Sequence, residues 1–207
     1  MSEVPDWLLP LVAATADLDG KVLSPFLPPD DSGRKSAVLI LFGDGPDVLL
    51  IQRAADMRSH AGQPAFPGGA VDPGDQDAVA AALREAQEET GLDPAGVQVL
   101  HALPNLWLPP SNFVVTPVLG YWREPCEVSA MDPAEVESVH RIPLADLTDP
   151  RNRVSVRHPS GYIGSGFTVA GMLVWGFTAG LLDRIIALAG WERPWDSDHI
   201  VDIGWTG

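Results

Sequence analysis

A glycine-rich loop that leads into a strongly acidic helix is the feature that most constrains this chain. The loop spans residues 66 to 75 and reads FPGGAVDPGD, and the segment from Asp75 to Thr90 is predicted to be helical. Three of its residues stand at i, i+3 and i+4, namely Glu85, Glu88 and Glu89. At about 3.6 residues per turn these side chains share one face, which is expected to meet solvent. The opposite, packing face comprises Val79, Leu83, Ala86 and Thr90.

Three carboxylates on one side of a packed helix suit hard divalent cations. Mg2+ and Mn2+ prefer oxygen ligands in octahedral geometry, so this face predicts a metal site held by Glu85, Glu88 and Glu89. Arg84 stands four residues before Glu88 and is expected to orient Glu88 or Glu85 rather than touch a substrate. The alternative is an ordinary solvated helix face, stabilised by the same i,i+4 pair.

The glycine pair before the helix favours the metal site over the solvated face. Gly68 and Gly69 permit a close backbone approach that residues with a side chain would block. A glycine-rich loop in front of an acidic helix can therefore bring a phosphate chain to bound metals. Gly91 then supplies the helix stop.

The spacing of these residues resembles the signature of a known family. The pattern Gly69-x5-Asp75-x8-Arg84-Glu85-x2-Glu88-Glu89-x-Gly91-Leu92 is similar to the Nudix box, which marks hydrolases that cleave a nucleoside diphosphate linked to another group. Asp75 stands where the box usually has Glu, and the spacer before Arg84 holds one residue more than the common form. Both departures lie in the loop and the first helical turn.

A second resemblance concerns the substrate. The segments LLIQRA, from residue 49, and RSHAGQPAFPGG, from residue 58, are similar to the motif that precedes the box in the coenzyme A diphosphatase subgroup. That subgroup also tends to have the longer spacer and an Asp-x-x-Asp, here Asp72 to Asp75. The segment VWGFTAGLL, from residue 174, resembles the last helix of the subgroup, so the likeness spans roughly residues 36 to 189.

The resemblance implies a fold, a reaction and a cofactor. The fold is expected to be the α/β (α+β) Nudix fold, a mixed β-sheet sandwiched between helices, as the order of strands and helices also indicates. The reaction would be hydrolysis of the diphosphate of coenzyme A, or of an acyl derivative, to 3′,5′-ADP and 4′-phosphopantetheine. Bound Mg2+ or Mn2+ would bridge diphosphate oxygens and lower the pKa of a bound water.

Catalysis is expected to rest on Glu85, Glu88 and Arg84. One of the helix glutamates, or a carboxylate from a distant loop, would take the proton from the attacking water. Glu135 and Glu137 are the candidates in such a loop, and the sequence does not choose between them.

Substrate binding is assigned to Arg53, Arg58, Gly68 and Gly69. Arginine matches phosphate oxygens bidentately, although both arginines can also be surface charges at a strand end. A second basic cluster consists of Arg151, Arg153 and Arg157. It could meet the 3′-phosphate of coenzyme A, but a solvated hairpin is the preferred interpretation.

Two other functions stay open. One is a Nudix hydrolase acting on ADP-ribose, NADH or another dinucleotide, or an oxidised nucleotide. The other is a catalytically silent domain that senses a nucleotide. Glu85, Glu88, Glu89 and Arg84 are all present, which argues against silence.

Composition limits the partners. The formal net charge of −15 argues against broad binding to nucleic acid or to anionic membranes. A single cysteine, Cys126, allows no intrachain disulfide, and Met1 to Trp7 does not resemble a signal peptide. These features predict a cytoplasmic protein.

The chain divides into three predicted parts. Residues 1–35 would form a short helix and a proline-rich arm, residues 36–190 the hydrolase domain, and residues 191–207 a tryptophan-rich tail. Strands are predicted at 36–42, 47–52, 97–103, 113–122, 136–142, 154–157 and 162–168, with a short helix over 143–147.

The last predicted helix, Ala170 to Ala189, is apolar around most of its circumference. Asp183 and Arg184 interrupt it before about 20 apolar residues accumulate, so a membrane span is not expected. Such a helix needs burial on more than one side, which favours a homodimer over cover by the arm and tail of the same chain. Three large aromatic residues predict that the tail packs on the domain or across the dimer rather than being disordered: Trp191, Trp195 and Trp205.

Overall fold

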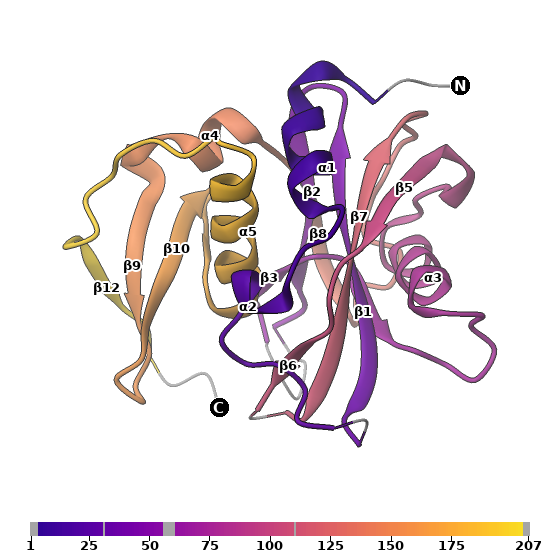
Figure 1. Ribbon diagram of the computed structural model, residues 1–207, viewed down its shortest axis with the longest axis horizontal. Helices are drawn as coiled ribbons and strands as arrows, with labels where there is room; N and C mark the ends of the chain where they lie inside the picture. Colours follow the sequence, from indigo (N-terminus) through magenta and orange to yellow (C-terminus); the bar gives the residue numbers. More distant parts are fainter. Residues whose placement is uncertain (1–3, 31, 56–60, 110, 205–207) are drawn as a thin grey trace.

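The computed structural model describes residues 4–30, 32–55, 61–109 and 111–204, which form two β-sheets with a helix between them (Figure 1). The larger sheet contains β1 (Arg34–Gly43), β2 (Asp47–Arg53), β3 (Pro64–Ala65), β4 (Gly68–Ala70), β5 (Val97–Ala102), β6 (Leu106–Leu108), β7 (Phe113–Trp122) and β8 (Val136–Pro143). The order β3-β2-β1-β7-β5 forms its centre, with β4 on β1, β6 on β7 and β8 on β2. Because β1 and β7 pair in parallel and β1 and β2 antiparallel, the sheet is mixed.

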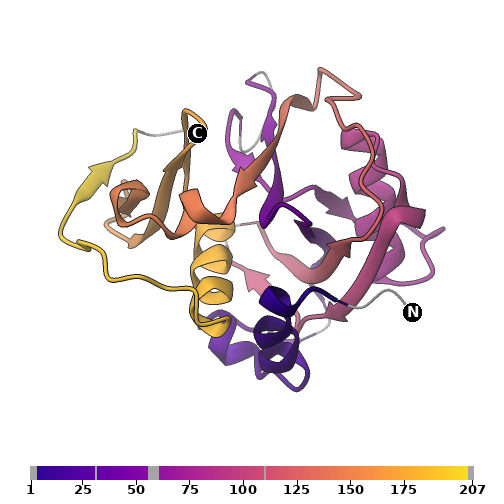
Figure 2. The same ribbon diagram turned by 90° about the horizontal axis from the view of Figure 1, so that it is seen from above.

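Helices cover both faces of this sheet. The helix α3 (Ala78–Thr90) packs on one face, where three small residues, Ala81, Ala82 and Ala86, meet Leu39 and Leu41 of β1. The other face is covered by η1 (Asp6–Leu8), α1 (Leu9–Thr15), α2 (Gly20–Leu23) and α5 (Gly176–Leu188). Seen from above, α1 and α2 lie beside α5 (Figure 2). The predicted mixed sheet between helices is confirmed.

The smaller sheet follows at the C-terminal end of the chain. It contains β9 (Arg153–Arg157), β10 (Ile163–Val169), β11 (Met172–Val174) and β12 (Ile200–Asp202), in the order β11-β10-β9-β12. Short helices join the elements: η2 (Pro94–Gly96) before β5, and α4 (Leu144–Thr148) and η3 (Pro150–Asn152) before β9. The seven strands and the short helix predicted from the sequence all occur, with ends shifted by a few residues.

The predicted helix from Ala170 is wrong in its first part. Ala170 and Gly171 both have positive φ, 51° and 75°, and join β10 to β11 in a two-residue hairpin. Both central residues of such a turn need positive φ, and the hairpin pairs Val169 with Met172. The helix α5 therefore begins only at Gly176.

The N-terminal segment and the start of the C-terminal tail meet on the core. The rings of Trp7 and Trp191 lie 5.7 Å apart, and Phe42 of β1 contacts both, with centroids at 6.1 and 5.8 Å. Further along the tail, the Trp195 ring lies 4.6 Å from the Arg153 guanidinium. The tail thus packs on its own chain, while Trp205 lies outside the described residues.

The apolar side of α5 is buried within the chain. Leu182 and Ile185 share one core with Leu8 and Leu11 of the N-terminal segment and with Phe167 of the smaller sheet. This is the intramolecular cover that the sequence left as the alternative to a dimer, and the homodimer stays a prediction. None of the helices in the described segments is long and apolar enough to span a membrane.

Candidate functional site

The acidic helix α3 begins later than predicted. Asp77 caps its N-terminus by accepting a hydrogen bond from the Ala80 N–H at 2.8 Å. Before it, the N–H of Asp75 donates to the carbonyl of Asp72 at 2.9 Å, which closes a turn. The helix ends as predicted, because Gly91 adopts φ 73° and its N–H donates to the Gln87 carbonyl.

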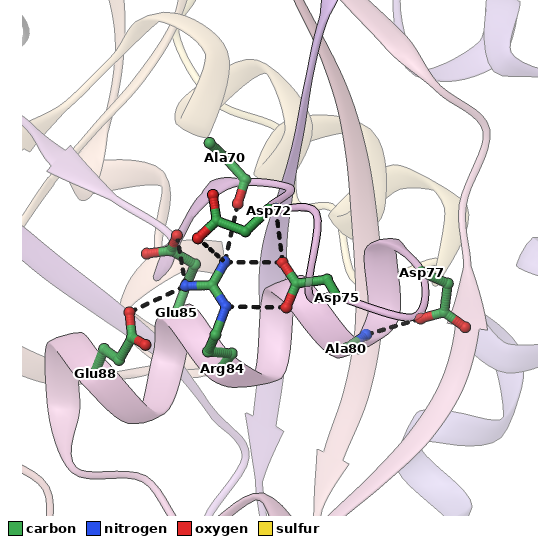
Figure 3. Close-up of polar contacts among 8 residues, drawn as sticks. All are labelled: Ala70, Asp72, Asp75, Asp77, Ala80, Arg84, Glu85 and Glu88. Carbon is green, nitrogen blue, oxygen red and sulfur yellow. Dashed lines mark hydrogen bonds and ion pairs between the residues drawn. The ribbon is translucent and has the colours of Figure 1, made fainter.

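Arg84 lies at the centre of the acidic residues (Figure 3). Its Nη1 donates to Glu85 Oε1 at 3.1 Å and to Glu88 Oε2 at 3.0 Å. Its Nη2 donates to the carbonyl of Ala70, at 3.0 Å, in β4, the strand that contains the glycine pair. One guanidinium therefore holds two of the three helix glutamates and the glycine-rich segment together.

Asp75 completes the surroundings of Arg84. Its carboxylate accepts from Arg84 Nε at 3.0 Å and from Nη2 at 2.9 Å, and it also accepts from the Asp72 N–H at 2.8 Å. The hydrogen bonds from Arg84 hold the pKa of Asp75 below its usual range. The sequence marked Asp75 as a departure from the box and as part of the Asp-x-x-Asp spacing, but it did not predict that Asp75 would be the partner of Arg84.

The sequence predicted that Glu89 lies on the solvent face of the helix, and this prediction is wrong. Glu89 is only 5% exposed, and its Oε2 accepts a hydrogen bond from the Gly68 N–H at 2.9 Å. Glu89 follows Ala82 and Ala86 at i+7 and i+3, so it extends the buried stripe of the helix. Burial raises the pKa of Glu89 to about 7, and the N–H of Gly68 only partly opposes this.

Gly68 and Gly69 have different roles in the loop. A Cβ on Gly69 would lie 2.5 Å from Glu85 Oε1 and 2.6 Å from Oε2, so a side chain there would displace this carboxylate. A Cβ on Gly68 would collide with the Ala37 carbonyl oxygen, and the Gly68 N–H donates to Glu89. Gly68 stays a predicted substrate-binding residue, although its backbone N–H is bonded to the acidic helix.

The donor set has the chemistry of a divalent-cation site, although its ligands are not gathered around one point. Within the described ranges, no three acidic, histidine or cysteine side chains are close enough together to hold a metal by themselves. Burial nevertheless raises the pKa values of both Glu85 and Glu89, and Glu85 raises that of Glu89 further. A divalent cation held by these two carboxylates would offset that penalty, so their chemistry fits one. The Glu88 side chain is 59% exposed and bonded to Arg84, so it would first have to exchange that partner.

Two charged residues approach Glu89 from other elements. Arg53, at the end of β2, is close enough to lower the pKa of Glu89, whereas Glu135 raises it. The Nε of Arg53 is buried and has no hydrogen-bond partner among the described residues. The backbone of Glu135 is fixed by the Ala54 N–H, which donates to its carbonyl at 2.9 Å. Arg58 lies outside the described residues.

The basic cluster near the C-terminus is not an open patch. Arg151 pairs with Asp149 at 2.6 Å, and Arg157 pairs with Asp202 at 3.2 Å. Arg153 is 2% exposed, pairs with Asp183, and lies between the rings of Phe167 and Trp195. The solvated hairpin predicted from the sequence is wrong for Arg153, because the tail covers it.

Comparison with known proteins identifies the family. A sequence model of the Nudix domain matches residues 33–160, more than half of the 207 residues. The chain belongs to the Nudix family. This places β1 to β8 and α3, with all the residues around Arg84, inside the family domain.

Relatives and solved structures agree with this assignment. A protein named "uncharacterized Nudix hydrolase NudL" from Cronobacter sakazakii is 40% identical over 177 residues, which cover 78% of this chain and 85% of that protein. Its namesake from Pectobacterium atrosepticum is 51% identical over 100 residues, covering 47% of this chain and about half, 52%, of its own length. The crystal structure of a NUDIX hydrolase from Nitrosomonas europaea superposes with a TM-score of 0.54 at 15% identity, covering 84% of this chain and 81% of that one. The last comparison supports the fold alone.

Proposed function

We propose that this chain hydrolyses the diphosphate of coenzyme A or its acyl derivatives with Mg2+ or Mn2+, releasing 3′,5′-ADP and 4′-phosphopantetheine or its acyl form. The coarser statement, that it is a hydrolase of phosphorus anhydrides in nucleoside diphosphate derivatives, follows from the Nudix family. One observation carries the proposal. The buried carboxylate of Glu89 lies within electrostatic range of Arg53, which belongs to the subgroup motif and has an unpartnered buried Nε.

In this proposal the acidic helix holds the cation. Glu85 and Glu89 would hold it, with Glu88 as a third ligand if it exchanged its bond to Arg84. A cation held there would supply charge neutralisation for the diphosphate and activation of the attacking water. Arg84 keeps Glu85 in place through the 3.1 Å bond, and Gly69 leaves the space that this carboxylate needs.

The remaining residues act on the substrate and the proton. Arg53 Nε donates to a diphosphate oxygen, which satisfies its buried N–H. Glu135 takes the proton from the attacking water, because its charge lies near Glu89 and it stands in a loop outside the helix. Glu85 and Glu88 remain the alternative bases. We also propose a cytoplasmic location and a homodimer, as the sequence predicts.

The experiment that tests the proposal is a product analysis with competing substrates. Purified protein is incubated with coenzyme A, ADP-ribose and NADH in parallel, with Mg2+ or with Mn2+, and the products are separated by chromatography. We expect 3′,5′-ADP and 4′-phosphopantetheine from coenzyme A at the highest kcat/KM. Faster cleavage of ADP-ribose or NADH would reassign the substrate, and binding without cleavage of any compound would favour a sensor.

A further inference from the structure

A row of polar side chains lies on β2 and β8, outside the acidic site. Gln52 pairs with Ser138 across the two strands, and His140 follows two residues later on β8. The Oγ of Ser138 lies 2.7 Å from His140 Nε2 and 3.4 Å from Gln52 Oε1. All three side chains are half-buried. We refer to Gln52, Ser138 and His140 as the polar row.

The polar row belongs to the sheet face that is turned toward α5 and the smaller sheet. Leu50, the cross-strand partner of His140, lies in the core with Phe167 of β10, and cross-strand partners share a face. Val139, between the two polar residues of β8, packs instead in the core beneath α3. Three hydrogen-bonding side chains thus lie together on the face that carries Leu50.

The hydrogen bonds within the row do not use all its donors. The Gln52 amide has two N–H donors in addition to the Oε1 that faces Ser138. No described residue accepts a hydrogen bond from that amide nitrogen. The donors of this half-buried amide are therefore open to a partner that the folded chain does not itself supply.

The row begins one residue before Arg53 on β2. The pairing of β2 with β8 shifts between Gln52, which faces Ser138, and Arg53, which faces Val136. Such a bulge changes the direction of side chains, and bulges are frequent next to active sites. Arg53 is the residue within range of Glu89, so consecutive residues of β2 link the diphosphate position to the polar row.

We propose that the polar row binds the part of the substrate beyond the diphosphate, through a neutral group that presents a hydrogen-bond donor next to an acceptor. This inference rests on the proposed function. Gln52 and Ser138 carry no charge, so they do not select a phosphate, whereas amide and hydroxyl groups complement an amide bond or the edge of a nucleobase. In coenzyme A these two sources are the amides of the pantetheine arm and the adenine ring.

The test compares substrates that share adenine but differ in amides. Gln52→Met keeps the length and flexibility of the side chain and removes its hydrogen bonds, and Ser138→Ala removes one hydroxyl. Each is expected to raise the KM for coenzyme A about 5- to 10-fold, the loss of a neutral hydrogen bond, with kcat unchanged. The matched control is Gln98→Met, which should leave KM unchanged. Gln98 is also a half-buried glutamine, but it lies on β5. Thermal unfolding identifies any variant that fails to fold, and the other variant then carries the test.

The substrates separate the outcomes. A KM that rises for coenzyme A but not for ADP-ribose identifies the pantetheine amides, and an equal rise for both identifies the adenine edge. An unchanged KM for both, or a rise for ADP-ribose alone, overturns the inference. The affinity for coenzyme A in EDTA, measured by calorimetry, distinguishes failure of this inference from failure of the proposed function. If wild type binds without cleaving, the function fails while the affinities of the variants still test the row; if wild type does not bind, both fail.

Discussion

The carboxylate of Asp75 receives two hydrogen bonds from the guanidinium of Arg84, at 3.0 Å from Nε and 2.9 Å from Nη2. This fork leaves Nη1 to hold Glu85 and Glu88. A bidentate arginine–carboxylate pair fixes direction as well as distance. The loop that precedes the helix therefore sets the position of the acidic side chains on it.

Replacing Asp75 should loosen this arrangement. Asp75→Asn keeps the size of the side chain but turns one acceptor into a donor, which cannot receive the second bond from Arg84. We expect kcat to fall about 10-fold with little change in KM, because a positioning contact is lost rather than a substrate contact. Asp77→Asn is the control, since asparagine caps a helix as well as aspartate does. Equal kcat values for the two variants would show that Asp75 is not needed.

Glu85→Gln and Glu89→Gln test the metal site. Each removes one negative charge while keeping the shape, and in Glu89→Gln the amide oxygen can still accept the bond from the Gly68 N–H. We expect turnover to fall about 100-fold or more in each, with an unchanged or higher unfolding temperature. Rate and thermal unfolding are measured on the same samples, with the exposed Glu124→Gln as control. Near wild-type turnover in both variants would reject the assignment.

The pH dependence of stability without metal reports on Glu89. Its pKa is raised from 4.5 to about 7, mainly by burial, so the folded state holds its proton more tightly than the unfolded state does. The resulting stability is fully present below about pH 4.5 and is lost as the pH rises through about 7. Unfolding by urea in EDTA should show a loss on the order of 3 kcal/mol across this window. Glu89→Gln should flatten the profile, and an unchanged profile would contradict the buried charge.

Arg53 should affect substrate binding more than folding. Arg53→Ala removes the unpartnered Nε and is expected to raise KM by the equivalent of about 1.5 to 3 kcal/mol, the range for a charge-assisted hydrogen bond. Arg53→Lys should recover only part of this, because lysine keeps the charge but not the fork. Arg151→Ala, which removes an exposed pair with Asp149, is the control. Arg58→Ala carries the same prediction from the sequence, and unaltered KM values would make both arginines surface charges.

The homodimer predicted from the sequence can be tested by mass. Light scattering at micromolar concentration should give twice the 22.1 kDa of one chain if the prediction holds. The structure weakens the reason for expecting a homodimer, since Leu8 and Leu11 already cover Leu182 and Ile185 of α5. A mass of one chain would mean that this cover is sufficient.

Local patterns predicted much of the fold and of the candidate site. The hairpin of β1 and β2, the long strand β7 and the helix stop at Gly91 follow from residues near one another in sequence, because alternation, turn residues and caps act over a few positions. The acidic residues of α3 were likewise recognisable from spacing alone. These features needed no knowledge of distant contacts.

Contacts between distant segments explain what the sequence predicted incorrectly. Residues 172–174 are apolar enough for a helix, yet they pair with β10 because a strand partner is available. The sequence predicted that Arg153 is a solvated charge, but in the folded chain Trp195 of the tail lies over its guanidinium. The depth of Glu89 depends on how α3 is rotated against β1, which periodicity predicts only to within a neighbouring position.

The sequence by itself determined the family signature, the order of strands and helices, and the identity of the acidic and basic candidates. Only the tertiary structure decided which carboxylates are buried, which arginine has a free donor, and that Asp75 is the partner of Arg84. The physical reason is that burial and hydrogen bonding depend on segments brought together by packing. Gly68 and Glu89, which are 21 residues apart and joined by one hydrogen bond, acquire their roles only in the folded chain.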